Sequence, residues 1–446
     1  MRDPARKWYT LVIFEELLDK IIRMESKRVV ITGMGIFSSI GKSVEEFLQS
    51  LREGRTGIGP ITLFDTSKYP SKIGAEIRDY RPEDFFEKKD LKRLSRTDQF
   101  ALIAAEEAVE NSGINSYVPE EVGICLGAGA GGMFEAETYH REILLKGKSK
   151  PSLLLPFIPS FTTTRVAERF RFSGPMATIT TACSSSATSI GYGADLIRNG
   201  KARAVLCGGS DALSELTFGG FNSLRATDPS PCKPFDKKRA GMSLGEGAAI
   251  LVLEGLDEAL KRGAKVYAEF LGYGIGGEAY HITAPEPTGM IEARIMGEAL
   301  EESGIKPSEV DYINAHGTGT PLNDKIETLS AKKVFGEKAY SVPISSIKSM
   351  VGHCLGSAGA IEAVASILSI VHGFVPPTVN HQEGDEDCDL DYVPGKSREM
   401  KVKVVLSNSF AFGGNCTTLV FGKYEADNRR QYLPAGRQEC RRQLLP

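Results

Sequence analysis

Apolar residues recur along the chain in two patterns, short unbroken runs and longer stretches with helical spacing. The short runs are rich in β-branched residues and predict buried strands, most of which end in a glycine-containing turn. They lie at 122–126, 204–207, 248–253, 310–314 and 404–408. Longer runs of small residues with helical spacing separate them, so the alternation predicts an α/β fold with largely buried sheets.

The two halves of the chain repeat this pattern. The strand and glycine turn at 122–132 return at 310–320, and the strand at 204–210 returns at 404–414. Self-similarity of this kind indicates an internal duplication, and the join between the halves is expected near 255–270.

We therefore expect an N-terminal half at 26–260 and a C-terminal half at 261–424. A leader at 1–25 precedes the first predicted strand and is not expected to belong to the fold. The tail at 425–446 is rich in Arg and Gln and poor in apolar periodicity, which predicts disorder.

Charge and cysteine usage exclude several classes of protein. The chain of 446 residues has 54 Lys plus Arg against 57 Asp plus Glu, a net charge of −3, so no partnership with nucleic acid is expected. The eight cysteines lie far apart without a C-x-x-C pair, which argues against a zinc site and against a disulfide framework.

The N-terminus and the apolar stretches bear on localisation. The apolar stretch at 361–371 contains Glu362 and falls short of the roughly 20 residues that span a bilayer, so no membrane span is expected. Acidic residues interrupt the only apolar stretch of the N-terminus, so there is no secretory pattern. We expect a cytoplasmic protein.

One cysteine has a setting that suits a nucleophile. Cys183 lies in the sequence Thr-Ala-Cys-Ser-Ser, directly before a helical run. A cysteine there faces the positive end of the helix dipole and unpaired N–H groups, which lower a thiol pKa and can bind an oxyanion. A small buried cysteine among serines is the alternative.

Two histidines and a lysine occupy similar junctions. His316 leaves the predicted strand at 310–314 and enters a glycine-rich turn, while Lys348 and His353 precede a small-residue helix. Strand ends open onto crevices in sheets of this kind, so these side chains are expected to face a cleft. Taken singly, each histidine could equally be structural. Three Cys or His positions at such junctions favour one shared site.

These segments resemble the β-ketoacyl-acyl-carrier-protein synthases of the elongating type, members of the thiolase-like superfamily, across residues 28–421. The matching motifs lie at 181–185, 314–318, 348–353, 356–360 and 408–414. The resemblance implies an α/β fold of the thiolase-like kind, with a duplicated five-layer αβαβα architecture. It also implies a homodimer that takes an acyl carrier protein as its partner.

The resemblance further implies a decarboxylative Claisen condensation in fatty-acid synthesis. Cys183 would hold the acyl chain as a thioester, while His316 and His353 would donate hydrogen bonds to the enolate formed when malonyl-carrier loses carbon dioxide. The backbone N–H groups of Cys183 and Phe412 would form the oxyanion hole. No metal and no resident cofactor are implied, because the phosphopantetheine arm of the carrier brings both substrates.

Supporting roles follow from the same resemblance. Lys348 would orient and polarise the site, and Glu362 would be the buried carboxylate of that network. Thr318 and Thr320 would hydrogen-bond the phosphopantetheine arm. Phe412 would be the gating aromatic that moves when the acyl chain loads.

The chain departs from the family pattern at three places. Ala411 stands where glycine usually separates the two phenylalanines of the gate, and a Cβ there would restrict positive φ. Asn415 and Cys416 replace the usual threonine and asparagine behind the gate. Ala130 takes the place of a branched aliphatic residue that lines the acyl pocket, which predicts a wider pocket.

A cluster of cations predicts a docking surface for the acidic carrier protein. Several of its members share one face if the stretch forms a single helix, although a solvated helix face is the usual explanation of such a cluster. The cluster comprises Lys88, Lys89, Lys92, Arg93 and Arg96.

Other functions remain open at this point. A ketosynthase of a polyketide-like pathway has the same motifs, whereas a non-catalytic chain-length partner subunit would lack Cys183. A thiolase needs a second active cysteine in a late C-x-G motif, and Cys416 is followed by two threonines. A papain-like hydrolase would need a local cysteine signature that is absent here.

Overall fold

The computed structural model describes residues 27–425. The predicted leader at 1–25, and the predicted tail apart from its first residue, lie outside the described residues. Ten strands form one mixed sheet in the order β11-β10-β14-β15-β9-β1-β8-β6-β4-β5. They are β1 (Val29–Ser38), β4 (Val122–Gly127), β5 (Met176–Ile179), β6 (Ala204–Asp211), β8 (Gly247–Gly255), β9 (Ala268–Gly277), β10 (Tyr312–Asn314), β11 (Ile344–Ser345), β14 (Val404–Ala411) and β15 (Asn415–Gly422).

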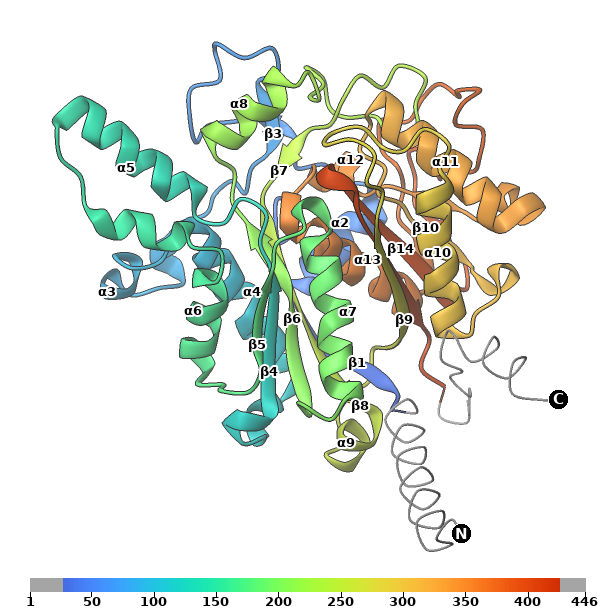
Figure 1. Cartoon of the computed structure of the whole chain (residues 1–446), viewed down its shortest axis with the longest axis horizontal. Helices are drawn as coiled ribbons and strands as arrows, with labels where there is room; N and C mark the ends of the chain where they lie inside the picture. The colour runs from blue at the N-terminus through green and yellow to red at the C-terminus, as the bar shows by residue number, and fades with distance from the viewer. Residues whose placement is uncertain (1–26, 426–446) are drawn as a thin grey trace, which may run out of the picture.

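The remaining elements surround this sheet (Figure 1). Short strands outside it are β2 (Gly59–Pro60), β3 (Ile73–Ala75), β7 (Leu244–Gly245), β12 (Phe374–Val375) and β13 (Arg398–Glu399). The α-helices are α2 (Val44–Glu53), α3 (Lys88–Leu91), α4 (Arg96–Ser112), α5 (Met133–Lys146), α6 (Phe161–Phe170), α7 (Ser185–Arg198), α8 (Glu215–Ser223), α9 (Leu256–Lys261), α10 (Met290–Ser303), α11 (Pro321–Phe335), α12 (Lys348–Val351) and α13 (Ala358–His372).

The sheet repeats one five-stranded pattern twice, as the sequence predicted. In the first half β4 runs parallel to β5 and β6, and β6, β8 and β1 follow as antiparallel neighbours. In the second half β10 runs parallel to β11 and β14, and β14, β15 and β9 follow in the same way. The two predicted repeats therefore match β4 with β10 and β6 with β14.

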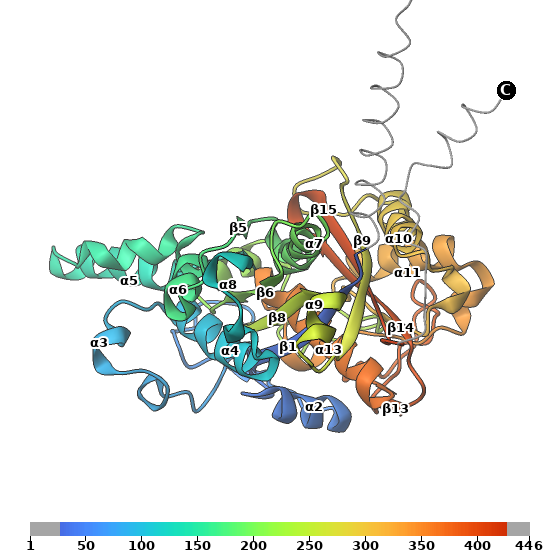
Figure 2. The ribbon, with the colours of Figure 1, turned by 90° about the horizontal axis from the view of Figure 1, so that it is seen from below.

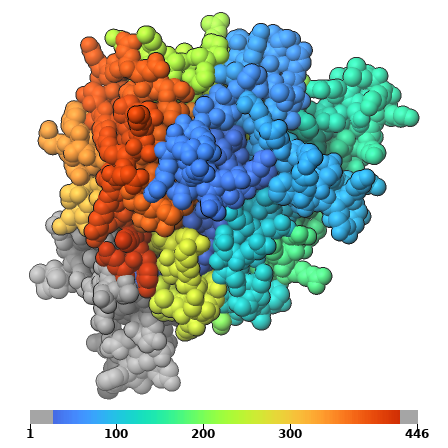
Figure 3. All heavy atoms as spheres, turned by 180° about the vertical axis from the view of Figure 1, so that it is seen from behind, coloured from blue at the N-terminus to red at the C-terminus, as the bar shows by residue number. Residues whose placement is uncertain are grey.

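Within the sheet, the two halves meet at a short seam. Strand β1 pairs with β9 at only three positions, Val29–Phe270, Val30–Glu269 and Ile31–Ala268. Figure 3 shows the first half, in blue and green, beside the second half, in yellow to red, on the back of the molecule.

Helices fill the layers that the duplicated architecture requires. Helices α7 and α13 contact each other and strands of both halves, so they form the middle layer. Helix α4 packs on β1 and β8, while α10 packs on β9 and β15, and these make the outer layers (Figure 2). The α/β fold of the thiolase-like kind is thus confirmed.

Helix α13 belongs to the one helical stretch of the described residues that is both long and strongly apolar. The stretch Leu355–His372 is long and apolar enough, by composition, to cross a membrane. However, 89% of it is buried inside the fold, where it packs in the middle layer. Its apolar side chains therefore belong to the protein core.

Candidate active site

Cys183 lies on a single 3-10 turn, η5 (Ala182–Ser184), that joins the end of β5 to the start of α7. Ala182 has a φ of 49°, in the left-handed region that a residue with a Cβ rarely adopts. Such a conformation costs about 1–2 kcal/mol, so the rest of the fold stabilises this turn. The result is a thiol placed at the N-terminal end of the central helix.

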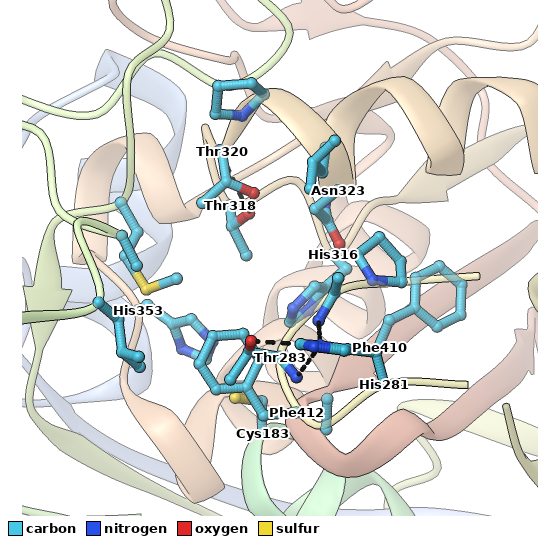
Figure 4. Close-up of a pocket in the computed structure, with 18 of the residues that line it drawn as sticks. Cys183, His281, Thr283, His316, Thr318, Thr320, Asn323, His353, Phe410 and Phe412 are labelled. Carbon is cyan, nitrogen blue, oxygen red and sulfur yellow. Dashed lines mark hydrogen bonds between the residues drawn. The ribbon is translucent and has the colours of Figure 1, made fainter. Parts of the chain in front are cut away.

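The three predicted catalytic side chains meet in one cavity of about 390 Å³. Cys183, His316 and His353 all line it, and Thr318 and Thr320 line its other end (Figure 4). The two imidazole rings stand edge to face with centroids 5.4 Å apart. Residues far apart in the sequence thus converge, as the strand-end positions predicted.

The hydrogen bonds of the two imidazoles fix which nitrogen carries the proton. Nδ1 of His353 accepts the backbone N–H of Leu355 at 3.1 Å. Nδ1 of His316 lies 3.3 Å from Nζ of Lys348. A lysine ammonium can only donate hydrogen bonds, so Nδ1 of His316 is the acceptor. Burial, and then the charge of Lys348, hold the pKa of both histidines well below its usual value. Both rings are therefore neutral, and each carries its proton on Nε2.

The thiol of Cys183 does not have the lowered pKa that its position at a helix start predicted. Burial raises the pKa of Cys183 to about 11, although the charge of Lys348 and a hydrogen bond from the backbone N–H of Phe412 act in the opposite direction. Desolvation of the thiolate outweighs the helix N-terminus. The resting form at neutral pH is therefore the thiol.

Lys348 and Glu362 form a buried ion pair behind the histidines. Their side chains are 1% and 2% exposed, and Nζ of Lys348 also donates to the backbone oxygen of His316 at 2.6 Å. Burial raises the pKa of Glu362 to about 7, against the effect of Lys348. The pair lies outside the cavity wall, so it acts on the reaction through His316.

Phe412 lies over the thiol at the cavity wall and stacks on Phe221, with ring centroids 5.6 Å apart. The backbone of the gate differs from the sequence expectation. Ala411 has a φ of −122°, in the extended region, so its Cβ imposes no strain here. The positive φ angles fall on Gly413 and Gly414, at 80° and 74°. The restriction expected from the Cβ of Ala411 is therefore absent here, because the left-handed conformations fall on the two glycines.

The other two departures from the family pattern lie outside the lining of the cavity. Cys416 is buried, and its thiol donates to Oε1 of Glu278 at 3.5 Å. Ala130 does not line the cavity. It packs, like Phe221, against the apolar cluster that contains Leu355.

Two buried carboxylates that the sequence did not reveal hold the turns of the site. Asp211 accepts backbone N–H groups from both halves, three from residues 129–131 and one from Gly356. Burial raises its pKa to about 6, against these four hydrogen bonds. Glu327 accepts the backbone N–H groups of His316 and Gly317, each at 2.8 Å.

The structure separates the members of the predicted docking cluster. Arg96 does not belong to it, because its guanidinium is largely buried and Nε donates to Oε2 of Glu246 at 2.9 Å. The other cations lie on or just after α3, which is far from the α11 side of the cavity (Figures 1 and 2). None of the five lines the cavity.

Comparisons with known proteins agree with this geometry. The beta-ketoacyl synthase N-terminal domain matches residues 26–259, and the beta-ketoacyl synthase C-terminal domain matches residues 267–382. The 3-oxoacyl-[acyl-carrier-protein] synthase 2 of Synechocystis sp. is 44% identical over 413 residues, which cover 90% of this chain and 99% of the relative.

Two solved structures superpose over 90% of this chain and 100% of their own length. The ishigamide ketosynthase/chain length factor has a TM-score of 0.86 and 40% identity. A ketosynthase in complex with its type II PKS acyl-carrier protein, bound to the hexaketide, has a TM-score of 0.84 and 32% identity.

Proposed function

This chain belongs to the beta-ketoacyl synthase family, and from that premise we propose that it extends acyl chains in fatty-acid synthesis. The reaction is the decarboxylative condensation of malonyl-carrier with an acyl chain held on Cys183. The product is a 3-oxoacyl-carrier longer by two carbons. The convergence of a thiol and two neutral Nε2–H donors in one cavity supports this function.

The first step transfers the acyl group. The sulfur of Cys183 attacks the carbonyl carbon of the acyl-carrier thioester, and the carrier leaves as its thiol with the proton that Cys183 gives up. The backbone N–H of Phe412 points at the sulfur, so together with that of Cys183 it is placed to bind the oxyanion. The high pKa of Cys183 makes deprotonation part of this attack.

The second step forms the carbon–carbon bond. Malonyl-carrier loses carbon dioxide, and the electron pair of the broken bond becomes an enolate whose oxygen accepts hydrogen bonds from His316 and His353. The enolate carbon then attacks the carbonyl carbon of the acyl thioester and expels the sulfur of Cys183 as a thiolate, which takes up a proton from water to regain the resting thiol. Uncharged donors fit this step, because their hydrogen bonds strengthen as negative charge develops on the enolate oxygen.

The direct test is incubation with malonyl-carrier and a ladder of acyl-carriers, followed by intact mass analysis of protein and products. An acyl adduct on the protein and a ketoacyl product two carbons longer are expected. Hydrolysis of the acyl-carrier without extension would contradict the proposal.

A polyketide-like pathway is the second candidate, supported by the likeness to the ishigamide ketosynthase/chain length factor. The same incubation separates the two, because repeated extension without reduction of the keto group gives poly-3-oxo products. The presence of Cys183 argues against a non-catalytic chain-length partner subunit.

We also propose the assembly in which this chemistry occurs. An acyl carrier protein is the partner, and its phosphopantetheine arm makes a resident cofactor unnecessary. A homodimer is supported by exposed apolar side chains on α5 and on η4 (Pro151–Phe157), and by the position of β5 at the edge of the sheet. They include Leu144, Leu145 and Phe157. A reducing cytoplasm suits the seven free thiols of the described part.

Ala130 does not line the cavity of Cys183, but it packs against the apolar cluster whose member Met242 does, and its small side chain predicts a wide acyl pocket there. Ala130→Ile adds three carbons against the apolar cluster around Leu355, so overpacking should move acceptance toward shorter acyl chains. The measurement is kcat/KM for acyl-carriers of increasing length. An unchanged length profile would contradict the assigned role of Ala130.

Carrier docking on the cluster after α3 predicts a selective effect of charge reversal. Lys92→Glu combined with Arg93→Glu should raise the apparent KM for carrier-bound substrate about tenfold at low salt, because attraction becomes repulsion. Short soluble thioesters should react as before. If the KM for carrier is unchanged, the carrier docks elsewhere.

A further inference from the structure

A buried carboxyl group in the cavity wall has no role in the chemistry described so far. Glu292, in the first turn of α10, is 1% exposed and lines the same cavity as Cys183 and His316. Its Oε2 accepts a hydrogen bond from Oγ of Ser330 at 3.0 Å. Its Oε1 is fully buried and has no hydrogen-bond partner within residues 27–425.

The surroundings of Glu292 favour its neutral form. Burial raises its pKa well above the usual value, and the carboxylates of Glu327 and Glu278 raise it further. The fold does not need the carboxyl for its own hydrogen bonding, because the Ser330 hydroxyl also lies within 2.9 Å of the backbone oxygens of Gly289 and Ile326. A free polar atom in such a place costs stability unless a ligand satisfies it.

Several other polar groups that line the cavity already have hydrogen-bond partners. The hydroxyls of Thr318 and Thr320 lie 2.9 Å apart and bond each other. The backbone N–H of Gly413 donates to the oxygen of Ile282 at 2.7 Å, and Nδ1 of His281 accepts the N–H of Thr283 at 3.1 Å (Figure 4). Among the described residues that line the cavity, Glu292 is the one with a buried side-chain oxygen that has no hydrogen-bond partner, so a molecule that enters the cavity can supply it.

We propose that the free oxygen of Glu292 binds a secondary amide of the pantetheine arm and so helps to position the thioester at Cys183. This rests on the proposed function, because that reaction sends such an arm through the cavity. A secondary amide offers an N–H and a C=O, and a neutral carboxyl can pair with either. The small acyl group and the sulfur offer no comparable partner.

The test compares three butyryl thioesters that differ in their amides. They are an S-ethyl thioester with none, an N-acetylcysteamine thioester with one and a pantetheine thioester with two. The measured quantity is the second-order rate constant for acylation of Cys183, followed by intact mass. Glu292→Met removes the hydrogen-bonding group at similar side-chain volume. Glu292→Gln keeps a group that can form hydrogen bonds.

With Glu292→Met, acylation by an amide-containing thioester should fall about fivefold to tenfold, the effect of one lost hydrogen bond. The S-ethyl thioester should react at the wild-type rate, and Glu292→Gln should restore most of the loss. Glu298→Met on the same helix, outside the cavity wall, is the matched control and should change nothing.

Urea unfolding of Glu292→Met supplies an independent readout. Removing an unsatisfied buried polar group should leave the unfolding midpoint unchanged or raise it. If Glu292→Met slows acylation equally for all three thioesters, with or without a lowered unfolding midpoint, the residue has a structural role and the inference is overturned. No loss for any thioester would overturn it too. Failure of wild type to acylate Cys183 with any of them would instead refute the proposed function.

Discussion

Cys183→Ala is expected to abolish condensation while decarboxylation of malonyl-carrier continues. The variant has no sulfur to hold the acyl chain, so extension should fall by about 10⁴-fold or more. The two imidazoles that stabilise the enolate stay in place, since their hydrogen bonds run to Leu355 and Lys348 and not to the thiol. Intact mass analysis and carbon dioxide release measure the two steps separately.

Cys125→Ala provides the matched control for that variant. Cys125 is a buried thiol on β4 that does not line the cavity, so its loss should affect stability more than turnover. An acyl adduct that persists in Cys183→Ala would place the nucleophile elsewhere. Loss of decarboxylation together with condensation would mean that the thiol takes part in both steps.

His353→Ala should produce the opposite pattern. Removing one neutral Nε2–H donor from the developing enolate should slow decarboxylation by about 10²- to 10³-fold, the usual effect of a lost oxyanion donor. Acyl transfer to Cys183 should remain within about tenfold of wild type, because the backbone N–H groups serve that step. Carbon dioxide release and the rate of adduct formation are the measurements.

His372→Ala is a suitable comparison, because His372 lies at the far end of α13 and does not line the cavity. It should leave both steps unchanged. If His353→Ala blocks adduct formation as strongly as decarboxylation, the histidine acts on the thiol and the assigned division of roles is wrong.

The sequence predicted the positions of the reacting groups well for a local reason. Cys183, His316 and His353 each lie next to a strand end or a helix start, and those junctions carry glycine and small-residue signals that a sequence displays. The sheet topology then brings these strand ends and helix starts together, so no other sequence signal is needed to predict that the three side chains meet. The repeat of β4 in β10 and of β6 in β14 was visible for the same reason.

The supporting groups were hidden because their partners are distant backbone amides. Asp211 bonds residues 129–131 and Gly356, and Glu327 bonds the turn at His316. Because every residue except proline carries a backbone N–H, no sequence pattern marks these contacts. Likewise, the pKa of Cys183 depends on how much water the folded cavity excludes, which a helix start does not indicate.

Arg96 shows an error that local rules could have prevented. Ser95 and Asp98 form a capping box, in which each side chain accepts the backbone N–H of the other residue. That signal starts a new helix at Arg96, separate from α3. Treating residues 88–96 as one helix therefore placed a buried cation on an exposed face.

The seam between the two halves has a consequence for how activity is lost. The nucleophile comes from one repeat and both hydrogen-bond donors for the enolate come from the other, so neither repeat contains a working centre. Three residue pairs between β1 and β9, and contacts such as the hydrogen bond from Ala360 N–H to Ser186 Oγ, keep them in register. Slippage by a fraction of an ångström along that junction would misalign sulfur and imidazoles while each repeat stayed intact. Inactivation can therefore precede unfolding.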